Sequence, residues 1–144
     1  MKRTKKNNKG FSLVELIVVV LIMAIIAVAL APQVMKWVNE SRKSADASTY
    51  DSVVAAAQDA LADEAAWNAC ADKTFTITID KTGCTVQTGA PDAFNDSFQT
   101  HLGGDKAVKA IKMKQSDVTA VVTVDKGTVV RTTEPVADAK KDGE

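Results

Sequence analysis

The 144-residue chain is poor in the side chains that build catalytic and metal sites. It has one histidine, His101, and two cysteines, Cys70 and Cys84. Two cysteines without a nearby histidine leave too few ligands for a zinc site. The lone histidine belongs to no Ser/His/Asp or Cys/His grouping, and the sequence has no G-x-x-x-x-G-K-[ST] phosphate loop. We therefore predict no catalytic residue, no metal site and no cofactor, and we expect a protein that is not an enzyme.

The chain also lacks a net charge: its 18 basic and 18 acidic residues give a formal net charge of zero at pH 7. The charges are nevertheless unevenly spread, since the first ten residues hold no acid and five bases, namely Lys2, Arg3, Lys5, Lys6 and Lys9. Past this segment no basic patch with interleaved aromatic residues occurs, which argues against a direct nucleic-acid site. A short basic segment followed by an apolar run is instead typical of membrane targeting.

The apolar run extends from Phe11 to Ala31, and only Ser12 and Glu15 within it are not apolar. A helix rises about 1.5 Å per residue, so this run would span roughly 31 Å, close to the hydrocarbon thickness of a bilayer. Basic residues prefer the cytoplasmic side. We therefore expect a single-pass precursor whose N-terminus lies inside and whose C-terminal part lies outside.

Two simple interpretations of this run are a cleaved secretory signal and a plain uncleaved anchor. For a signal, Ala29-Leu30-Ala31 would supply the small-x-small cleavage pattern. Pro32 would then follow the cut directly, where a proline is expected to obstruct processing. Glu15 also interrupts the usual smooth change from basic to apolar residues. Both features count against the secretory signal.

The residues around Gly10 favour a third interpretation. Lys9-Gly10-Phe11-Ser12-Leu13-Val14-Glu15-Leu16 resembles the prepilin processing site of the type IV pilin family, which includes the pseudopilins of type II secretion and DNA-uptake systems. The resemblance covers about residues 1–50 and is strongest to a major pilin. It implies cleavage between Gly10 and Phe11 by a prepilin peptidase, N-methylation of Phe11, and retention of the apolar segment.

Glu15 is the one acid of the apolar run, and the resemblance implies that it pairs with the Phe11 amine of a neighbouring subunit. A carboxylate in hydrocarbon costs a few kcal/mol and is normally paired or functional. Within its own chain we expect only the new Phe11 amine, four residues away, as a partner. A buried ion pair roughly offsets its own desolvation, whereas an unpaired buried charge is strongly unfavourable. Glu15 would therefore fix the register between subunits, although a shallow carboxylate that reaches the lipid headgroups is an alternative.

Pro32 should kink or locally melt the helix, because proline removes a backbone donor and clashes with the preceding turn. Beyond it, an amphipathic helix is predicted from about Gln33 to Trp67, with Arg42 and Asp46 as an ion pair on its polar side. Its apolar or small positions should pack on the chain's own sheet; they are Val34, Trp37, Val38, Ser41, Ala45, Ser48, Val53, Ala57, Leu61 and Ala65.

The remainder of the chain predicts a small antiparallel sheet. Strands are expected at residues 74–79, 84–88, 108–114, 118–124 and 128–132, although residues 108–114 also fit a helix, and Asp92 should cap a short helix that runs to about Leu102. Short strands with tight turns favour a meander. The predicted class is α+β, a long N-terminal helix packed on an antiparallel β-sheet head, with divisions at residues 1–10 (leader), 11–32 (membrane and filament core), 33–69 (amphipathic half), 70–133 (head) and 134–144 (disordered tail).

Cys70 and Cys84 would face an oxidising compartment in this topology, where pairing is favoured. A bridge between them would close a loop of about 15 residues and contribute roughly 3 kcal/mol in the chain-entropy model. Two free thiols are the alternative. Many members of the resembled family close a loop nearer the C-terminus instead, so the receptor-binding loop of those members is not expected here.

The leading hypothesis is a structural one, a pilin subunit that polymerises into a helical surface filament. The resemblance also implies a pilus assembly platform and minor pilins as partners, with the membrane holding the precursor. The alternatives are a pseudopilin, made less favoured by the lack of calcium-loop spacing, and a monomeric membrane-anchored binding module. A secreted enzyme has the least support.

Overall fold

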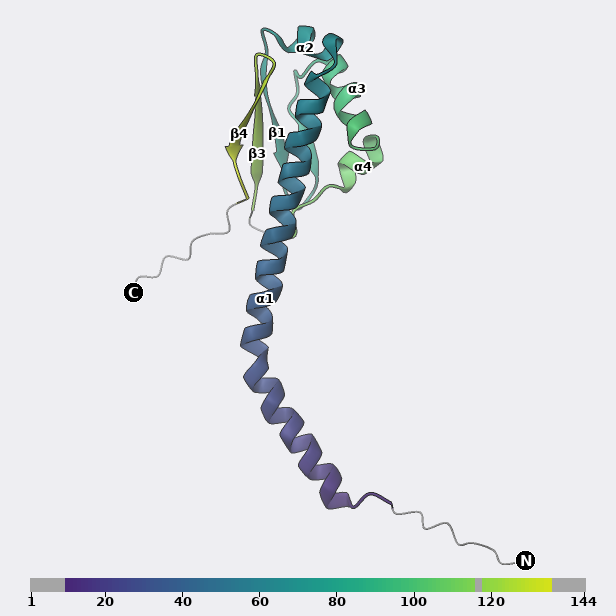
Figure 1. Ribbon diagram of the computed structural model, residues 1–144, viewed down its shortest axis with the longest axis vertical. Helices are drawn as coiled ribbons and strands as arrows, with labels where there is room; N and C mark the ends of the chain where they lie inside the picture. Colours follow the sequence, from purple (N-terminus) through teal and green to yellow (C-terminus); the bar gives the residue numbers. More distant parts are fainter. Residues whose placement is uncertain (1–9, 116–117, 136–144) are drawn as a thin grey trace, which may run out of the picture. The chain divides into compact units, whose positions relative to one another are not determined.

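The computed structural model describes residues 10–115 and 118–135 (Figure 1). Most of the predicted leader and most of the predicted tail therefore lie outside the described residues. The elements are α1 (Leu13–Leu61), α2 (Glu64–Cys70), β1 (Thr74–Ile79), β2 (Cys84–Val86), α3 (Asp92–His101), α4 (Asp105–Ala110), β3 (Ala120–Asp125) and β4 (Thr128–Thr133). This arrangement confirms the predicted α+β class, a long N-terminal helix with a small antiparallel sheet. The chain forms two compact units, one up to Asn39 and one from Glu40 onward.

Helix α1 runs through Pro32 without an interruption of its helical assignment, so no local melt occurs there. The helix ends at Leu61, and the prediction of one helix up to Trp67 is therefore wrong. Asp63 causes the break, because its carboxylate accepts a hydrogen bond of 3.0 Å from the Ala65 N–H and caps α2. A short polar side chain that binds an amide two residues later competes with continued helix.

The four-stranded sheet has the order β2-β1-β3-β4, with every neighbouring pair antiparallel. The predicted meander is wrong, because β1 pairs with β3 across the segment that holds α3 and α4. The strand predicted at residues 74–79 is confirmed in full, and its alternation puts Phe75, Ile77 and Ile79 into the core.

The strand predicted at residues 108–114 is also wrong, since helix α4 and a loop occupy this segment. Two features favour the helix. Gly103 and Gly104 have φ values of +90° and +98°, which end α3 and redirect the chain. Asp105 and Lys109 then form a four-apart ion pair of 2.7 Å on the exposed side of α4.

The core of the second unit lies between the sheet and the helices. The part of α1 from Asp46 to Leu61 contributes eight buried residues. Phe75 of β1 meets Phe94 of α3 edge-on at 4.8 Å, and Phe94 stacks on Phe98 at 5.6 Å between ring centroids. Burial of large apolar side chains is the main favourable term in folding, so this cluster holds α3 on the sheet.

The amphipathic prediction for residues 33–67 is correct only for some of the positions that it named. Val53, Ala57 and Leu61 are buried as expected. In contrast, Val34, Trp37 and Val38 are 47%, 61% and 42% exposed. Ser41, Ser48 and Ala65 are exposed as well.

Asp46, predicted on the polar side, is fully buried and makes no ion pair with Arg42. Its carboxylate instead accepts hydrogen bonds from the Lys114 N–H, the Gln115 N–H and the Gln115 side-chain amide. These bonds satisfy a buried acid without a cation, and they fasten the loop after α4 to α1.

Candidate processing and assembly site

The bond predicted to be cleaved lies in an irregular, exposed segment ahead of α1. Gly10, Phe11 and Ser12 are all exposed and lie outside the helix, and the Phe11 side chain is 92% exposed. Apart from its neighbours in the chain, no described residue has an atom within 4 Å of the position that a Cβ on Gly10 would take. The segment around the Gly10–Phe11 bond is thus open to a peptidase.

Glu15 closes the first turn of α1. The Ser12 N–H donates a hydrogen bond of 2.9 Å to Glu15 Oε2. Ser12 directly precedes the helix, and Glu15 is the third residue of the helix. The hydrogen bond from the Ser12 N–H to the Glu15 carboxylate is therefore one of the two reciprocal bonds of a capping box. The carboxylate also lies where the helix dipole favours an anion.

This contact corrects the expectation that Glu15 has no intrachain partner other than the Phe11 amine. The sequence did carry the signal, because Ser12-Leu13-Val14-Glu15 has the S-x-x-E spacing that precedes an apolar helix. The structure thereby brings Ser12 and Glu15 together. The pairing of Glu15 with Phe11 of another subunit stays a prediction.

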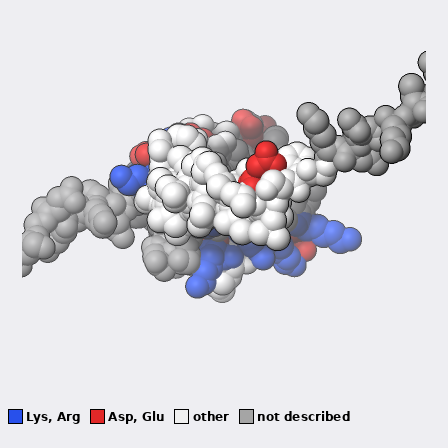
Figure 2. All heavy atoms as spheres, turned by 90° about the horizontal axis from the view of Figure 1, so that it is seen from below, with Lys and Arg blue, Asp and Glu red and all other residues white. Residues whose placement is uncertain are grey.

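An apolar surface, here called the apolar segment (residues 13–31), follows the cap. Its large side chains are each between 46% and 77% exposed; they are Leu13, Val14, Leu16, Ile17, Val18, Val19, Val20, Leu21, Ile22, Met23, Ile25, Ile26, Val28 and Leu30. Figure 2, viewed from below, shows a near face that is largely uncharged. Helix α1 is long and apolar enough to cross a membrane. Exposed apolar surfaces of this extent mark sites of membrane or protein interaction.

Cys70 and Cys84 are both buried in the core of the second unit and are not bonded to each other in the structure. Burial raises the pKa of the Cys84 thiol to about 11, and burial also raises the pKa of Cys70, with Lys73 acting in the opposite direction. Protonated, buried thiols are poor nucleophiles. The disulfide between them stays a prediction.

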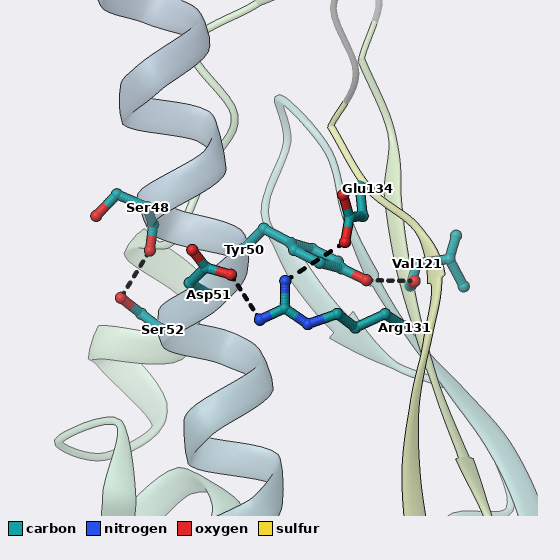
Figure 3. Close-up of polar contacts among 7 residues, drawn as sticks. All are labelled: Ser48, Tyr50, Asp51, Ser52, Val121, Arg131 and Glu134. Carbon is teal, nitrogen blue, oxygen red and sulfur yellow. Dashed lines mark hydrogen bonds and ion pairs between the residues drawn. The ribbon is translucent and has the colours of Figure 1, made fainter.

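A polar cluster joins the last strand to α1 (Figure 3). Arg131 of β4 lies 2.8 Å from Asp51 of α1 and 3.4 Å from Glu134, and its guanidinium sits 5.5 Å from the centroid of the Tyr50 ring. The Tyr50 hydroxyl donates to the Val121 carbonyl at 3.4 Å. Burial is the main cause that raises the pKa of Tyr50. Glu134 and Pro135 are the residues of the predicted tail that the structure describes, and the disorder of this tail stays a prediction.

His101, Cys70 and Cys84, the residues considered above for metal or catalytic chemistry, do not form a common site among the described residues. His101 lies exposed on α3, beside an open hollow of about 670 Å³ that Asp59, Asp63 and Asp96 also line. In residues 10–115 and 118–135, no group of three His, Cys, Asp or Glu residues is arranged to hold a metal ion.

Comparisons with known proteins found one family model and one relative. Residues 5–31 match the family described as the prokaryotic N-terminal methylation motif. The type IV major fimbrial protein FimA of Dichelobacter nodosus is 31% identical over 119 residues, which cover 83% of this chain and 71% of that protein. No solved structure matches the chain.

Proposed function

Because the chain belongs to the type IV pilin family, we propose that it is a structural pilin subunit that is cut after Gly10, held in the membrane by residues 11–32 and polymerised into a surface filament. The observation that carries this proposal is the apolar segment, with its large side chains about half to three-quarters exposed and a single acid at its start. Such a surface has to be covered by lipid or by other helices.

Lipid surrounds the apolar segment first, and the helices of other subunits surround it later. In the bilayer the apolar segment gains little by self-association, because lipid tails are equally apolar. Outside the bilayer, burial of apolar surface is worth about 25 cal/mol per Å2. Leaving the membrane therefore becomes favourable only when the helices of neighbouring subunits replace the lipid, and this requirement favours a filament with a helical core.

Glu15 sets the register of that core in this proposal. After cleavage and N-methylation, the Phe11 amine of one subunit pairs with Glu15 of the next, and two desolvated charges are neutralised at one axial offset. The Ser12 N–H holds Glu15 at the helix end until then, since this hydrogen bond exists within a single chain. A wrong offset leaves a charge unpaired in an apolar surrounding, which is strongly unfavourable.

The remaining parts of the proposal concern partners and covalent features. A prepilin peptidase and methylase would act on Gly10 and Phe11, and an assembly platform with minor pilins would move the subunit from the membrane into the filament. Pro32 would bend α1 where the membrane segment ends. Cys70 and Cys84 would be joined once the second unit is outside the cell.

Mass spectrometry of the purified protein, together with electron microscopy of sheared cell-surface material, tests the proposal. We expect a mature chain that begins with methylated Phe11 and forms filaments. In a Gly10→Leu variant the leader should stay attached and filaments should be absent. A mature chain that begins at Pro32 would mean a secreted domain, and one that begins at Met1 a simple anchor; either overturns the proposal. Correct processing without surface filaments would favour the pseudopilin role.

A further inference from the structure

A group of apolar side chains beyond Pro32 has no role in the membrane segment proposed above. Val34, Met35, Trp37 and Val38 are 47%, 68%, 61% and 42% exposed, respectively. Lys36 is the one charged residue among them. These residues neither join the core of the second unit nor belong to the 11–32 span, so their exposure calls for a separate explanation.

The length of α1 indicates what surrounds them. Helix α1 begins at Leu13. At about 1.5 Å per residue, Pro32 lies roughly 29 Å from Leu13 along the helix, and Trp37 lies about 8 Å further. The hydrocarbon core is about 30 Å thick, and each headgroup layer adds about 5–8 Å. If Leu13 marks the inner edge of the hydrocarbon, Pro32 lies close to the outer edge and Trp37 falls within the outer headgroup layer.

The chemistry of this short stretch suits that layer. An indole ring has an apolar body and one N–H donor, and Trp is enriched at membrane–water boundaries. A lysine beside it can lay its aliphatic stem along apolar groups while its ammonium reaches phosphate or water. Trp37 and Lys36 are adjacent and exposed, and they follow the apolar segment after residues 32–35.

We propose that Trp37, assisted by Lys36, is an interfacial anchor that binds the outer headgroup layer of the membrane and sets the depth of the subunit before assembly. The inference rests on the proposed function for the membrane-held state of the chain, and it adds a site to that state. The partner is a phospholipid surface, and the contact ends when the subunit enters the filament.

Trp67 serves as an internal control for testing the anchor role of Trp37. Trp67, the second tryptophan, lies on α2 and is 49% exposed. Its indole packs against Gly127, so close that a Cβ there would approach Nε1 within 2.8 Å. Trp67 thus reports on the folded second unit, whereas Trp37 should report on lipid.

The test is tryptophan quenching in the full chain reconstituted into phosphatidylcholine vesicles. A Trp67→Phe variant leaves Trp37 as the sole emitter, and a Trp37→Phe variant leaves Trp67. Lipids brominated close to the headgroup should quench Trp37 more than lipids brominated near the chain end, and neither should quench Trp67. Stronger quenching of Trp37 by the deep bromines, or no quenching by either lipid, overturns the proposal. If Trp67→Phe does not fold, the difference in quenching between wild type and Trp37→Phe gives the same information.

A second measurement separates this inference from the filament proposal. Trp37→Tyr should keep the helix at its depth in the bilayer, and Trp37→Ala should let it shift. The depth is read from lipid quenching of tryptophan emission in a Val28→Trp, Trp67→Phe background. An unshifted Trp37→Ala variant contradicts the anchor even if filaments form normally. Failure of the wild type to form filaments leaves the quenching result intact and contradicts only the proposed function.

Discussion

The backbone N–H of Ser12 donates a 2.9 Å hydrogen bond to the Glu15 carboxylate. One side chain thus has a local task, which is to cap α1, and a proposed intermolecular task, which is to pair with Phe11 of another subunit. The local task needs only an acceptor oxygen, whereas the intermolecular task needs a negative charge. Substitutions at Glu15 can therefore separate the two.

Glu15→Val and Glu15→Gln should both leave membrane insertion intact and both strongly reduce filament yield. Valine removes the acceptor and the charge, whereas glutamine keeps an acceptor for the Ser12 N–H and removes the charge. The measurement is the amount of sheared filament relative to the subunit in the membrane fraction. Normal filaments from Glu15→Gln would show that capping is the main task and would remove the registry argument.

Asp46→Ala should lower the free energy of unfolding by about 2–5 kcal/mol, because at least two backbone N–H groups, those of Lys114 and Gln115, lose their buried acceptor. Asp46→Asn keeps one acceptor oxygen and should cost less. Urea unfolding of the full chain in detergent, followed by circular dichroism, measures both. Asp59→Ala, at an exposed position of the same helix, is the matched control and should be close to neutral. Equal, small effects at Asp46 and Asp59 would contradict the anchoring role.

The proposed disulfide should be tested by thiol labelling in denaturant without reductant. Labelling of the folded protein does not discriminate, because Cys70 and Cys84 are buried whether or not they are bonded. In denaturant a bridged chain takes up no label until reductant is added, whereas free thiols take up two. We expect no label, and uptake of two in unreduced protein would exclude the bridge.

A chain with a free Cys84 should become less stable at alkaline pH. The pKa of this thiol is raised from 9.0 to about 11 by burial. Its contribution is fully present below pH 9 and is lost as the pH rises through 11, because the unfolded chain releases the proton first. The loss should be on the order of 2 kcal/mol. Cys84→Ser should show a smaller slope, because only the Cys70 thiol, whose pKa burial also raises, then remains. A disulfide-bonded wild type should lack the contribution of both thiols, so unfolding curves between pH 8 and 11 give a second readout of the bridge.

Gly127→Ala should be clearly destabilising. Gly127 has φ +76° in the β3–β4 turn, and a Cβ would lie 2.8 Å from Trp67 Nε1. The left-handed backbone alone costs about 1–2 kcal/mol with alanine, and the displaced indole adds to this. Gly89→Ala is the matched control, since φ is +107° there but nothing lies within 4 Å. A thermal shift no larger at Gly127 than at Gly89, with unchanged Trp67 emission, would contradict the clash.

Local patterns predicted the local elements of this chain well. The strict alternation of residues 74–79 defined β1 to the residue. The apolar run predicts the start of α1, and the S-x-x-E spacing of residues 12–15 is typical of the cap that the structure shows there. These features depend on neighbours within a few positions, so they can be read directly from the order of residues.

Other features depend on partners that are far away in the chain. Asp46 has the spacing of a solvent-facing residue, but its hydrogen-bond donors come from residues 114 and 115. The order of the strands is likewise set by the pairing of β1 with β3, which no turn signal encodes. The segment 108–114 is short and apolar enough to form a strand or a helix. The glycines before it and the Asp105–Lys109 ion pair favour the helix.

The central place of β1 in the sheet also affects how the chain is made. Its ladder joins Ile79 to Ala120 and Thr74 to Asp125, residues about forty to fifty positions apart. On the ribosome, β1 therefore emerges long before β3 has been synthesised. The apolar segment has by then already been synthesised. In the proposed membrane-held precursor, insertion of the apolar segment can therefore begin before the sheet closes. A product truncated ahead of residue 120 would leave one side of β1 as an unpaired edge that is prone to aggregation.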